Sequence, residues 1–430
     1  MEKQENNLDP KEKTQITEIT EKTENETQAG VIPVPSASEE TKETKAAEDP
    51  EKDIKKRKRN NIIFTIVSVL IIACVISVLV QLSSTLQEGN SATFGEMIAN
   101  MNGWYLLAVV ALFIVGFLLD SLKYTLLNKC NGYKLGFHKD MKVALTGKYY
   151  ENITPTATGG QPMQIYYLHK QGMPGANSAS VTMVKYGVQM LAWTIFAAVV
   201  MGCLVGTLSA IEDTVTRTTV YVCGWIGFCI NGMIPVVVIF VVFCPRAVAW
   251  VANLFVRILH KIHIVKNAEK MQARIRKWMD DFAIFSQFIF RHPVWFLLLF
   301  LLCLAEPIIQ FIIPYFLLIA LCGQYVTAGW ELFFTVVGLA MYSTYAAVFI
   351  PTPGNSGAVE SVFMLAFASI ASGVLFWYVL IWRFVLYYSY IVMGIGMNIF
   401  DVVVNLRQEK KRRSFQLGNQ SQSGNQRKDE

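Results

Sequence analysis

Charged residues and metal-binding side chains are scarce in this 430-residue chain. Asp, Glu, Lys and Arg together make up 16% of it, whereas 53% of its residues are hydrophobic. Of the five scattered histidines, His260 and His263 stand three apart, but no third metal ligand accompanies them. The sequence also contains neither a P-loop nor a G-x-S-x-G motif. We therefore expect no metal and no cofactor, and we identify no candidate catalytic residue.

Paired cysteines are lacking as well. The eight cysteines mostly fall within or beside apolar runs, and none of them forms a C-x-x-C pair. This placement predicts small apolar packing residues rather than a disulfide framework.

Aromatic residues are absent from residues 1–53, which contain 15 acidic and seven basic residues and so carry a net charge of −8. A segment of this composition cannot bury a core, and we predict a disordered acidic tail. Residues 406–430 are predicted to form a second, basic and disordered tail. Between them, residues 54–405 form the predicted membrane domain.

Several apolar runs in this domain reach about 20 residues, the length that crosses a bilayer. The sequence predicts an all-α polytopic membrane protein with about seven or eight transmembrane helices. We expect the protein in a bacterial-type cell membrane. Basic runs at Lys55–Arg59 and Arg407–Arg413 place both termini on its cytoplasmic side. The expected spans lie at residues 62–82, 103–122, 178–209, 218–243, 294–321, 331–350 and 376–403, with a shorter apolar segment at 361–375.

Two polar, Pro/Gly-broken segments interrupt this pattern. Residues 143–170 contain Pro155, Gly159 and Gly160 and are too polar for a spanning helix. They are predicted to dip into the membrane from the cytoplasmic face, or else to form a plain cytoplasmic loop. The basic loops follow the distribution expected of membrane topology, and we do not expect nucleic acid binding.

The second break runs from Pro351 to Glu360. Pro351 and Pro353 cannot continue a helix, Thr352 is pushed towards an extended conformation, and Gly354 and Gly357 permit a turn. A new helix then begins, with Asn355 or Ser356 as its N-cap. This stretch is either a surface turn or a re-entrant tip. A re-entrant hairpin at 331–375 plus one span satisfies the charge distribution, and so do three full crossings.

The two breaks resemble one another, Pro155-Thr156-Ala157-Thr158-Gly159-Gly160 against Pro351-Thr352-Pro353-Gly354-Asn355-Ser356-Gly357. Paired broken segments entering from opposite sides are typical of inverted-repeat transporters, whose binding sites lie between them. A chance similarity of a few residues is the alternative.

Ionisable residues within spans cost about 2.5–3.5 kcal/mol each on insertion scales, so each needs a partner or a function. Asp120, Glu306, Glu360 and Arg383 are such residues. Glu360 and Arg383 are predicted to face a shared polar cavity, where the alternative is a purely structural ion pair.

Helices that begin near Gly160 and Gly357 would present N–H groups suited to a phosphate. Lys148, Lys185 and Arg383 would add positive charge there, and Glu151 is a further candidate for the same site. A polar cavity of this kind suits a lipid headgroup, an ion or a small solute.

Three groups of residues resemble a known family. They are Asn152-Ile153-Thr154-Pro155 with Gly159-Gly160, the run from Pro351 to Glu360, and Arg383 ahead of Tyr387-Tyr388. Together they are similar to the transmembrane region of lysylphosphatidylglycerol synthases, which is also called flippase-like after the multiple peptide resistance factor. The resemblance covers roughly residues 60–405. The sequence differs from the family pattern at Asn355, where members often have glycine, and at Gln161 and Gln164, where they often have charged residues. These differences leave the headgroup preference open.

The resemblance implies movement of aminoacylated phosphatidylglycerol or a related lipid between leaflets and resistance to cationic peptides. Full-length members carry a cytoplasmic synthase domain. This chain ends about 25 residues after its last expected span, so we do not expect it to transfer lysine by itself.

The sequence thus predicts a membrane lipid translocase for a phospholipid or glycolipid. The alternatives are a membrane subunit that supports a separate lipid-modifying enzyme and an ion-coupled transporter of a small solute. The sequence leaves open whether the chain forms a homo-oligomer. The predicted substrate-binding residues are Lys148, Glu151, Pro155, Gly159, Gly160, Glu306, Pro351, Thr352, Pro353, Gly354, Gly357, Glu360 and Arg383.

Overall fold

The computed structural model describes residues 92–154, 157–244, 268–322, 326–348, 354–371 and 373–401, with isolated positions at 73, 77, 247–248, 250, 253–254, 256–257, 352 and 403–404. All regular elements in these residues are helices, so the predicted all-α polytopic fold is confirmed. The two expected tails lie outside the described residues, as does the expected span at 62–82 apart from residues 73 and 77.

Within the described residues, five helices are long and apolar enough to cross a membrane. They have 27 to 30 residues each, or about 40–45 Å at 1.5 Å per residue, against a hydrocarbon core of about 30 Å. The last one begins as α15 (Leu375–Arg383) and contains a π-helical turn at Phe384–Tyr388. The five are α5 (Gly103–Cys130), α8 (Gly175–Cys203), α9 (Thr214–Phe243, apolar to Val241), α12 (Pro293–Cys322) and the final helix, Leu375–Asp401.

Polar side chains cap the beginning of two of these helices, α5 and α9. At the start of α5, the Asn102 side chain accepts a hydrogen bond from the Trp104 N–H at 3.1 Å, and Asp213 accepts one from the Thr216 N–H at 2.8 Å before α9.

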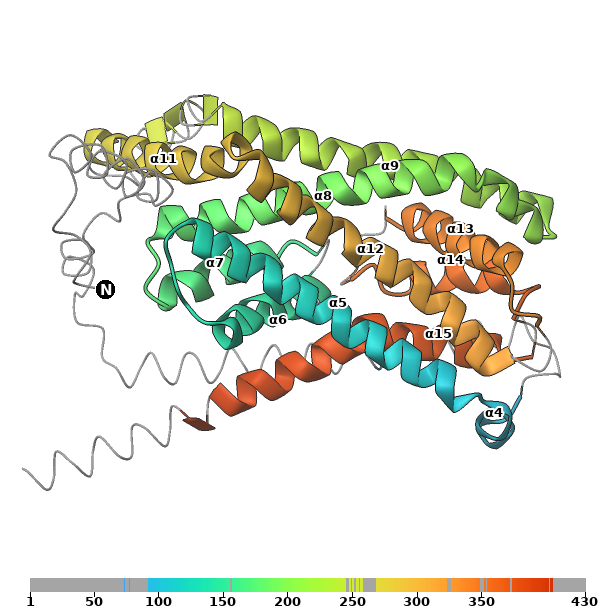
Figure 1. Cartoon of the computed structure of the whole chain (residues 1–430). Helices are drawn as coiled ribbons and strands as arrows, with labels where there is room; N and C mark the ends of the chain where they lie inside the picture. Colours follow the sequence, from blue (N-terminus) through green and yellow to red (C-terminus); the bar gives the residue numbers. More distant parts are fainter. Residues whose placement is uncertain are drawn as a thin grey trace, which may run out of the picture.

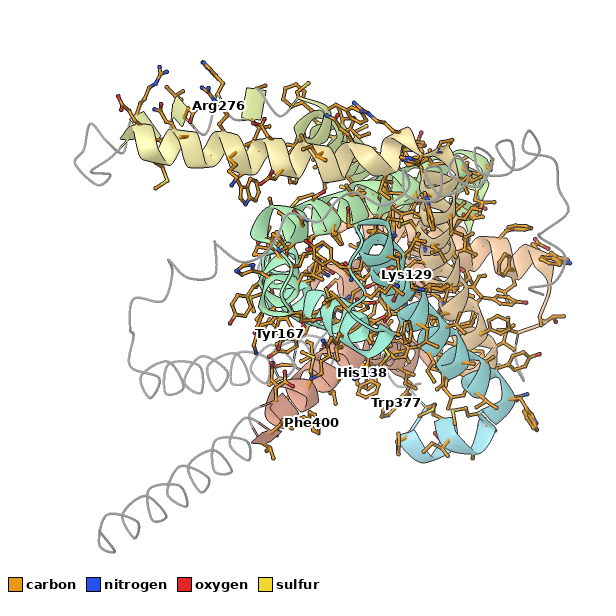
Figure 2. The ribbon with its side chains drawn as sticks, turned by 60° about the vertical axis from the view of Figure 1, so that its left-hand side comes forward. Lys129, His138, Tyr167, Arg276, Trp377 and Phe400 are labelled. Carbon is orange, nitrogen blue, oxygen red and sulfur yellow. The ribbon has the colours of Figure 1, made fainter. Side chains whose placement is uncertain are left out.

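The amphipathic helix α4 (Phe94–Asn100) precedes α5 at one end of the bundle, and α11 (Ala268–Arg291) lies at the opposite end (Figure 1). Figure 2 shows the charged side of α11, with Arg276, turned away from the bundle.

The first broken segment forms a helical hairpin, α6 (Phe137–Ile153) and α7 (Gly160–Lys170). At its tip, the Thr154 hydroxyl accepts the Gly159 N–H at 2.9 Å and donates to the Tyr150 carbonyl at 2.6 Å. A Cβ on Gly160 would lie 2.9 Å from the Gly147 carbonyl oxygen, so only glycine lets the two helices approach this closely. Pro155 lies outside the described residues.

The second broken segment forms a hairpin from α13 (Trp330–Ala346) and α14 (Ala358–Phe367). These helices have 17 and 10 residues, or about 26 and 15 Å, and fall short of a bilayer core. The geometry therefore favours one hairpin plus one span over three full crossings. The two hairpins enter the bundle from opposite ends, α6 and α7 from the end near α11, α13 and α14 from the end near α4 (Figure 1).

A stack of aromatic rings fixes α14 against the final helix. The Phe363 ring stacks between Phe367 and Trp382, with centroid distances of 4.2 and 3.9 Å. Tyr378 packs on the same rings and donates its hydroxyl proton to the Pro314 carbonyl of α12 at 3.0 Å. This packing places Glu360 of α14 beside Arg383 of the final helix.

The contact between α9 and α13 provides a test of this arrangement. A Cβ at Gly227 would overlap the backbone carbonyl of Tyr345, which cannot move aside as a side chain can. We expect Gly227→Ala to destabilise the protein by about 1–3 kcal/mol, the usual cost of overpacking. The melting temperature in detergent measures this effect.

Gly396→Ala is the matched control, because a Cβ there meets nothing within 4 Å. It should stabilise the final helix slightly, by up to about 1 kcal/mol. Equal melting temperatures for the two variants would contradict the close approach of α9 and α13.

Candidate functional site

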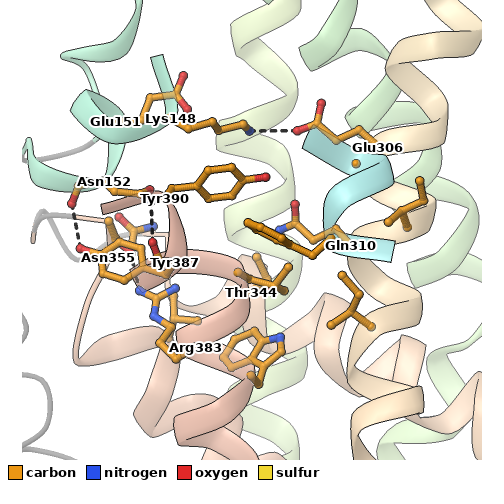
Figure 3. Close-up of a pocket in the computed structure, with 18 of the residues that line it drawn as sticks. Lys148, Glu151, Asn152, Glu306, Gln310, Thr344, Asn355, Arg383, Tyr387 and Tyr390 are labelled. Carbon is orange, nitrogen blue, oxygen red and sulfur yellow. Dashed lines mark hydrogen bonds and ion pairs between the residues drawn. The ribbon is translucent and has the colours of Figure 1, made fainter. Parts of the chain in front are cut away.

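A cavity of about 350 Å³ lies where the tips of the two hairpins meet the final helix (Figure 3). Apolar side chains from α5, α8 and α12 form part of its wall, among them Phe113, Trp193 and Ile313. Its polar lining comes from both hairpins, from α12 and from the final helix: Lys148, Glu151, Asn152, Glu306, Gln310, Thr344, Asn355, Arg383, Tyr387 and Tyr390. The volume suits a polar headgroup or a small solute.

Arg383 and Glu360 form a buried ion pair at this cavity. The Arg383 Nε donates to Glu360 Oε1 at 2.6 Å, and Nη2 donates to the Gly354 carbonyl at 2.7 Å. The second carboxylate oxygen of Glu360 accepts the Gly357 N–H at 2.8 Å. Gly354 and Gly357 both have positive φ, which lets the loop curl around the guanidinium. The pair thus holds the second tip in shape.

Tyr387 connects this tip to the first hairpin. Its ring lies under the Arg383 guanidinium, with 4.2 Å between the guanidinium carbon and the ring centroid. Its hydroxyl donates to the Asn152 carbonyl at 2.7 Å, and the Asn152 amide donates back to the Tyr387 carbonyl at 3.2 Å. The tips of two hairpins from opposite ends are therefore held through one tyrosine.

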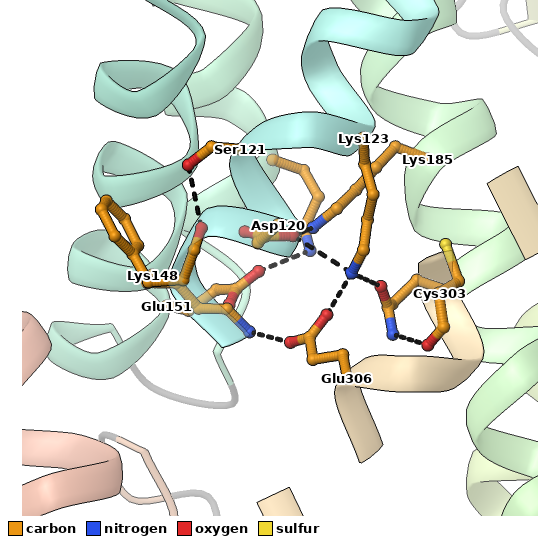
Figure 4. Close-up of polar contacts among 11 residues, drawn as sticks. Asp120, Ser121, Lys123, Lys148, Glu151, Lys185, Cys303 and Glu306 are labelled. Carbon is orange, nitrogen blue, oxygen red and sulfur yellow. Dashed lines mark hydrogen bonds and ion pairs between the residues drawn. The ribbon is translucent and has the colours of Figure 1, made fainter. Parts of the chain in front are cut away.

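A chain of five alternating charges runs from the bundle interior to the cavity (Figure 4). Asp120 pairs with Lys185 at 2.8 Å and with Lys123 at 3.4 Å. Lys123 is fully buried and also pairs with Glu306, whose other oxygen accepts a hydrogen bond from Lys148 at 2.9 Å. The chain contains three lysines and two carboxylates, so its formal charge is +1, and it ends at the cavity on Lys148.

Amide side chains complete the hydrogen bonding of this chain. Gln189 accepts a hydrogen bond from Lys123 Nζ at 2.5 Å, and its amide donates to the Cys303 carbonyl at 3.1 Å. Because a buried charge is tolerated only when it is paired and hydrogen-bonded, these contacts explain how Lys123 can be fully enclosed.

The structure brings six of the thirteen predicted site residues together at the cavity. Lys148, Glu151, Glu306, Gly354 and Arg383 line the cavity, and Glu360 contacts it through Arg383. Gly159 and Gly160 serve the close packing of α6 and α7, and Thr352 donates its hydroxyl proton to the Ser356 carbonyl at 2.8 Å. Pro351 and Pro353, like Pro155, lie outside the described residues.

One detail of the second tip differs from the prediction. The N-cap of α14 is Gly357, and neither Asn355 nor Ser356 serves this role. Glu360 itself accepts the Gly357 N–H, so a carboxylate of the protein already occupies the helix end that the sequence assigned to a phosphate.

Lys123, Gln189 and Tyr387 are parts of the site that the sequence did not predict. Two weak signals were available, since Lys123 stands one turn after Asp120 and Gln189 one turn after Lys185, each on one helical face. Among the described residues, no group of three or more His, Cys, Asp or Glu side chains is arranged to hold a metal ion.

Reversing the charges of Arg383 and Glu360 tests whether the pair acts only through its mutual attraction. We expect the double variant Arg383→Glu with Glu360→Arg to stay as unstable as either single variant, because its residues can serve neither the Gly354 carbonyl nor the Gly357 N–H. Breaking a buried pair costs about 3–5 kcal/mol. Recovery of the wild-type melting temperature would show that those two backbone contacts contribute little.

Lys123→Met should lower stability by about 3–5 kcal/mol, because it leaves Asp120 and Glu306 each short of a positive partner. Lys142→Met is the matched control. Lys142 pairs with Asp401 at 2.7 Å, but its side chain is 35% exposed, so its loss should cost about 1 kcal/mol or less. The melting temperatures of the two variants measure these losses of stability. Similar losses in both would show that the buried chain of alternating charges contributes no more to stability than an exposed ion pair.

Comparison with known proteins places the chain in a family. The model of the lysylphosphatidylglycerol synthase TM region matches residues 66–394. A UPF0104 membrane protein of Archaeoglobus fulgidus is 24% identical over 315 residues, which cover 68% of this chain and 85% of that protein. The match to the family model spans both hairpins, the five alternating charges and the final helix as far as Gly394. The protein therefore belongs to the lysylphosphatidylglycerol synthase TM region family.

Proposed function

We propose that the protein moves a lipid with a phosphate-bearing headgroup, a phospholipid or glycolipid, between the leaflets of the cell membrane. The observation that carries this proposal is the position of the cavity between the tips of two hairpins that enter from opposite ends. Such a site can be reached alternately from either side if one hairpin or the other withdraws.

The lining of the cavity supports a headgroup as the cargo. Arg383 brings positive charge from the final helix and Lys148 from the first hairpin, and a guanidinium is well suited to a phosphate. The cavity holds about 350 Å³, enough for a headgroup but not for two acyl chains, which would remain in the surrounding lipid. The family name makes aminoacylated phosphatidylglycerol one candidate, and transport of that lipid would link the protein to resistance against cationic peptides.

Filling the cavity tests this function. Gln310→Trp places an indole in the cavity from α12, and we expect it to slow lipid translocation by about tenfold or more. Leu301→Trp on the exposed side of the same helix should leave the rate unchanged, because this side chain is already 53% exposed. The rate is measured in proteoliposomes with fluorescent acyl-labelled phosphatidylglycerol and an impermeant quencher.

The same vesicles separate a lipid from a soluble cargo. Uptake of inorganic phosphate without lipid translocation would contradict the proposal and favour transport of a small solute. In cells, deletion of the gene should lower the outer-leaflet content of the lipid while its total stays constant. A fall in the total would instead indicate that the protein supports lipid synthesis.

A further inference from the structure

Glu151 differs from the other carboxylates at the cavity. Glu306 contacts two lysines and Glu360 contacts Arg383, whereas no ion pair of Glu151 occurs within the described part of the chain. Its hydrogen-bond partner is the uncharged Gln161, whose Nε2 donates to Oε1 at 3.3 Å. Glu151 thus lines the cavity with a carboxylate that, among the described residues, interacts with Lys148 and Lys185 without forming a salt bridge to either.

The charges around the cavity balance only when Glu151 is ionised. The five-residue chain that ends on Lys148 carries +1, the pair of Arg383 and Glu360 carries zero, and Glu151 contributes −1. An anionic phosphate headgroup that enters this neutral site brings an uncompensated charge into a cavity inside the helical bundle. Uncompensated charge is costly within a membrane, so binding requires one more positive charge or one less negative charge.

We propose that Glu151 takes up one proton when an anionic phosphate headgroup binds, so that the loaded site is again neutral. The proton comes from water on the side where the headgroup enters, and it converts the carboxylate to a carboxylic acid. When the headgroup leaves on the other side, the proton returns to water there. Each anionic lipid is thereby translocated together with one proton, and a proton gradient drives the movement. This inference rests on the proposed lipid translocation.

The partner of Glu151 suits both of its protonation states. The Gln161 amide has a donor for the ionised carboxylate and a carbonyl oxygen that can accept the O–H of the protonated form. A lysine in this place would hold the carboxylate ionised. The charge of Glu151 can therefore change without leaving a buried polar group unpaired.

Every helix packed around Glu151 contributes to its electrostatic surroundings. α7 supplies the uncharged Gln161. The charged and titratable groups that interact with it are Lys148 on its own helix, Asp120 and Tyr124 on α5, Lys185 and Tyr186 on α8, Glu306 on α12 and Tyr390 on the final helix. The charged groups among these, Lys148, Asp120, Lys185 and Glu306, already belong to the ion-paired chain. Glu151 is therefore the group that can change its charge with the cargo.

Translocation of acyl-labelled phosphatidylglycerol is measured in proteoliposomes at equal pH on both sides. In the wild type, the rate should fall with rising pH, approaching about tenfold per pH unit where one proton per lipid limits the rate. Glu151→Gln copies the protonated form and keeps the contact with Gln161. This variant should translocate the same lipid at a rate independent of pH, and at high pH faster than the wild type. Its melting temperature verifies that it is folded.

Two controls separate this effect from a general response to pH. Glu331→Gln removes an exposed carboxylate at the start of α13, far from the cavity, and should keep the pH dependence of the wild type. Acyl-labelled phosphatidylethanolamine brings its own ammonium group, so its translocation by the wild type should not vary with pH.

A pH-independent wild-type rate for phosphatidylglycerol, or the same pH dependence in Glu151→Gln, would overturn the proton coupling while lipid translocation still stands. The absence of translocation of both lipids at every pH would overturn the proposed function and this inference with it.

Discussion

Compensation of buried charge is the constraint on which this structure depends. The interior between α5, α6, α8 and α12 holds three lysines and two carboxylates in one alternating chain, of which Lys123 is fully enclosed. Each carboxylate contacts two lysines, so none can be removed without leaving a partner uncompensated. This mutual dependence specifies the positions of four helices more strictly than apolar packing alone, since apolar faces tolerate small shifts.

The second hairpin and the final helix meet the same constraint with a different arrangement. Here Arg383 and Glu360 are close-range partners that also bind the backbone of a Gly-containing loop. The five-residue alternating chain thus stabilises charge through several side chains on different helices, whereas this site uses one ion pair and main-chain groups. Both arrangements end at the cavity, and Tyr387 is where the hairpin tips they support come into contact.

The sequence predicted the parts of the fold that depend on local composition. Apolar runs located the long helices, because 20 consecutive apolar residues have few other stable environments. The glycines and prolines at 155–160 and 351–357 located the hairpin tips, because they exclude a continuous helix there. The family and the all-α membrane fold were also predicted correctly.

The connections across the structure were not predictable from the sequence in this way. Lys148 and Glu306 are 158 residues apart, and they become partners because α6 and α12 both pack against α5. Asn355 and Ser356 are better N-cap residues than glycine, yet Glu360 supplies the acceptor from within the helix, and the positive φ of Gly357 makes that possible. The charged residues within the expected spans were recognised from the sequence. The ion-pair partner of each one, however, depends on which helix faces meet in the fold.

The π-helical turn at Phe384–Tyr388 also limits how the length of the final helix can vary. A π-turn accommodates one residue more than an α-turn, and a single residue rotates a helix by about 100°. Before the turn, Arg383 is fixed by the loop at Gly354; after it, Asp401 accepts hydrogen bonds from Lys142 and Tyr167 of the other hairpin. Deleting one residue within the turn would remove the extra residue and give a regular α-helix whose two halves can still keep these contacts. A deletion in the regular parts on either side would instead rotate one half by about 100° and break one set of contacts.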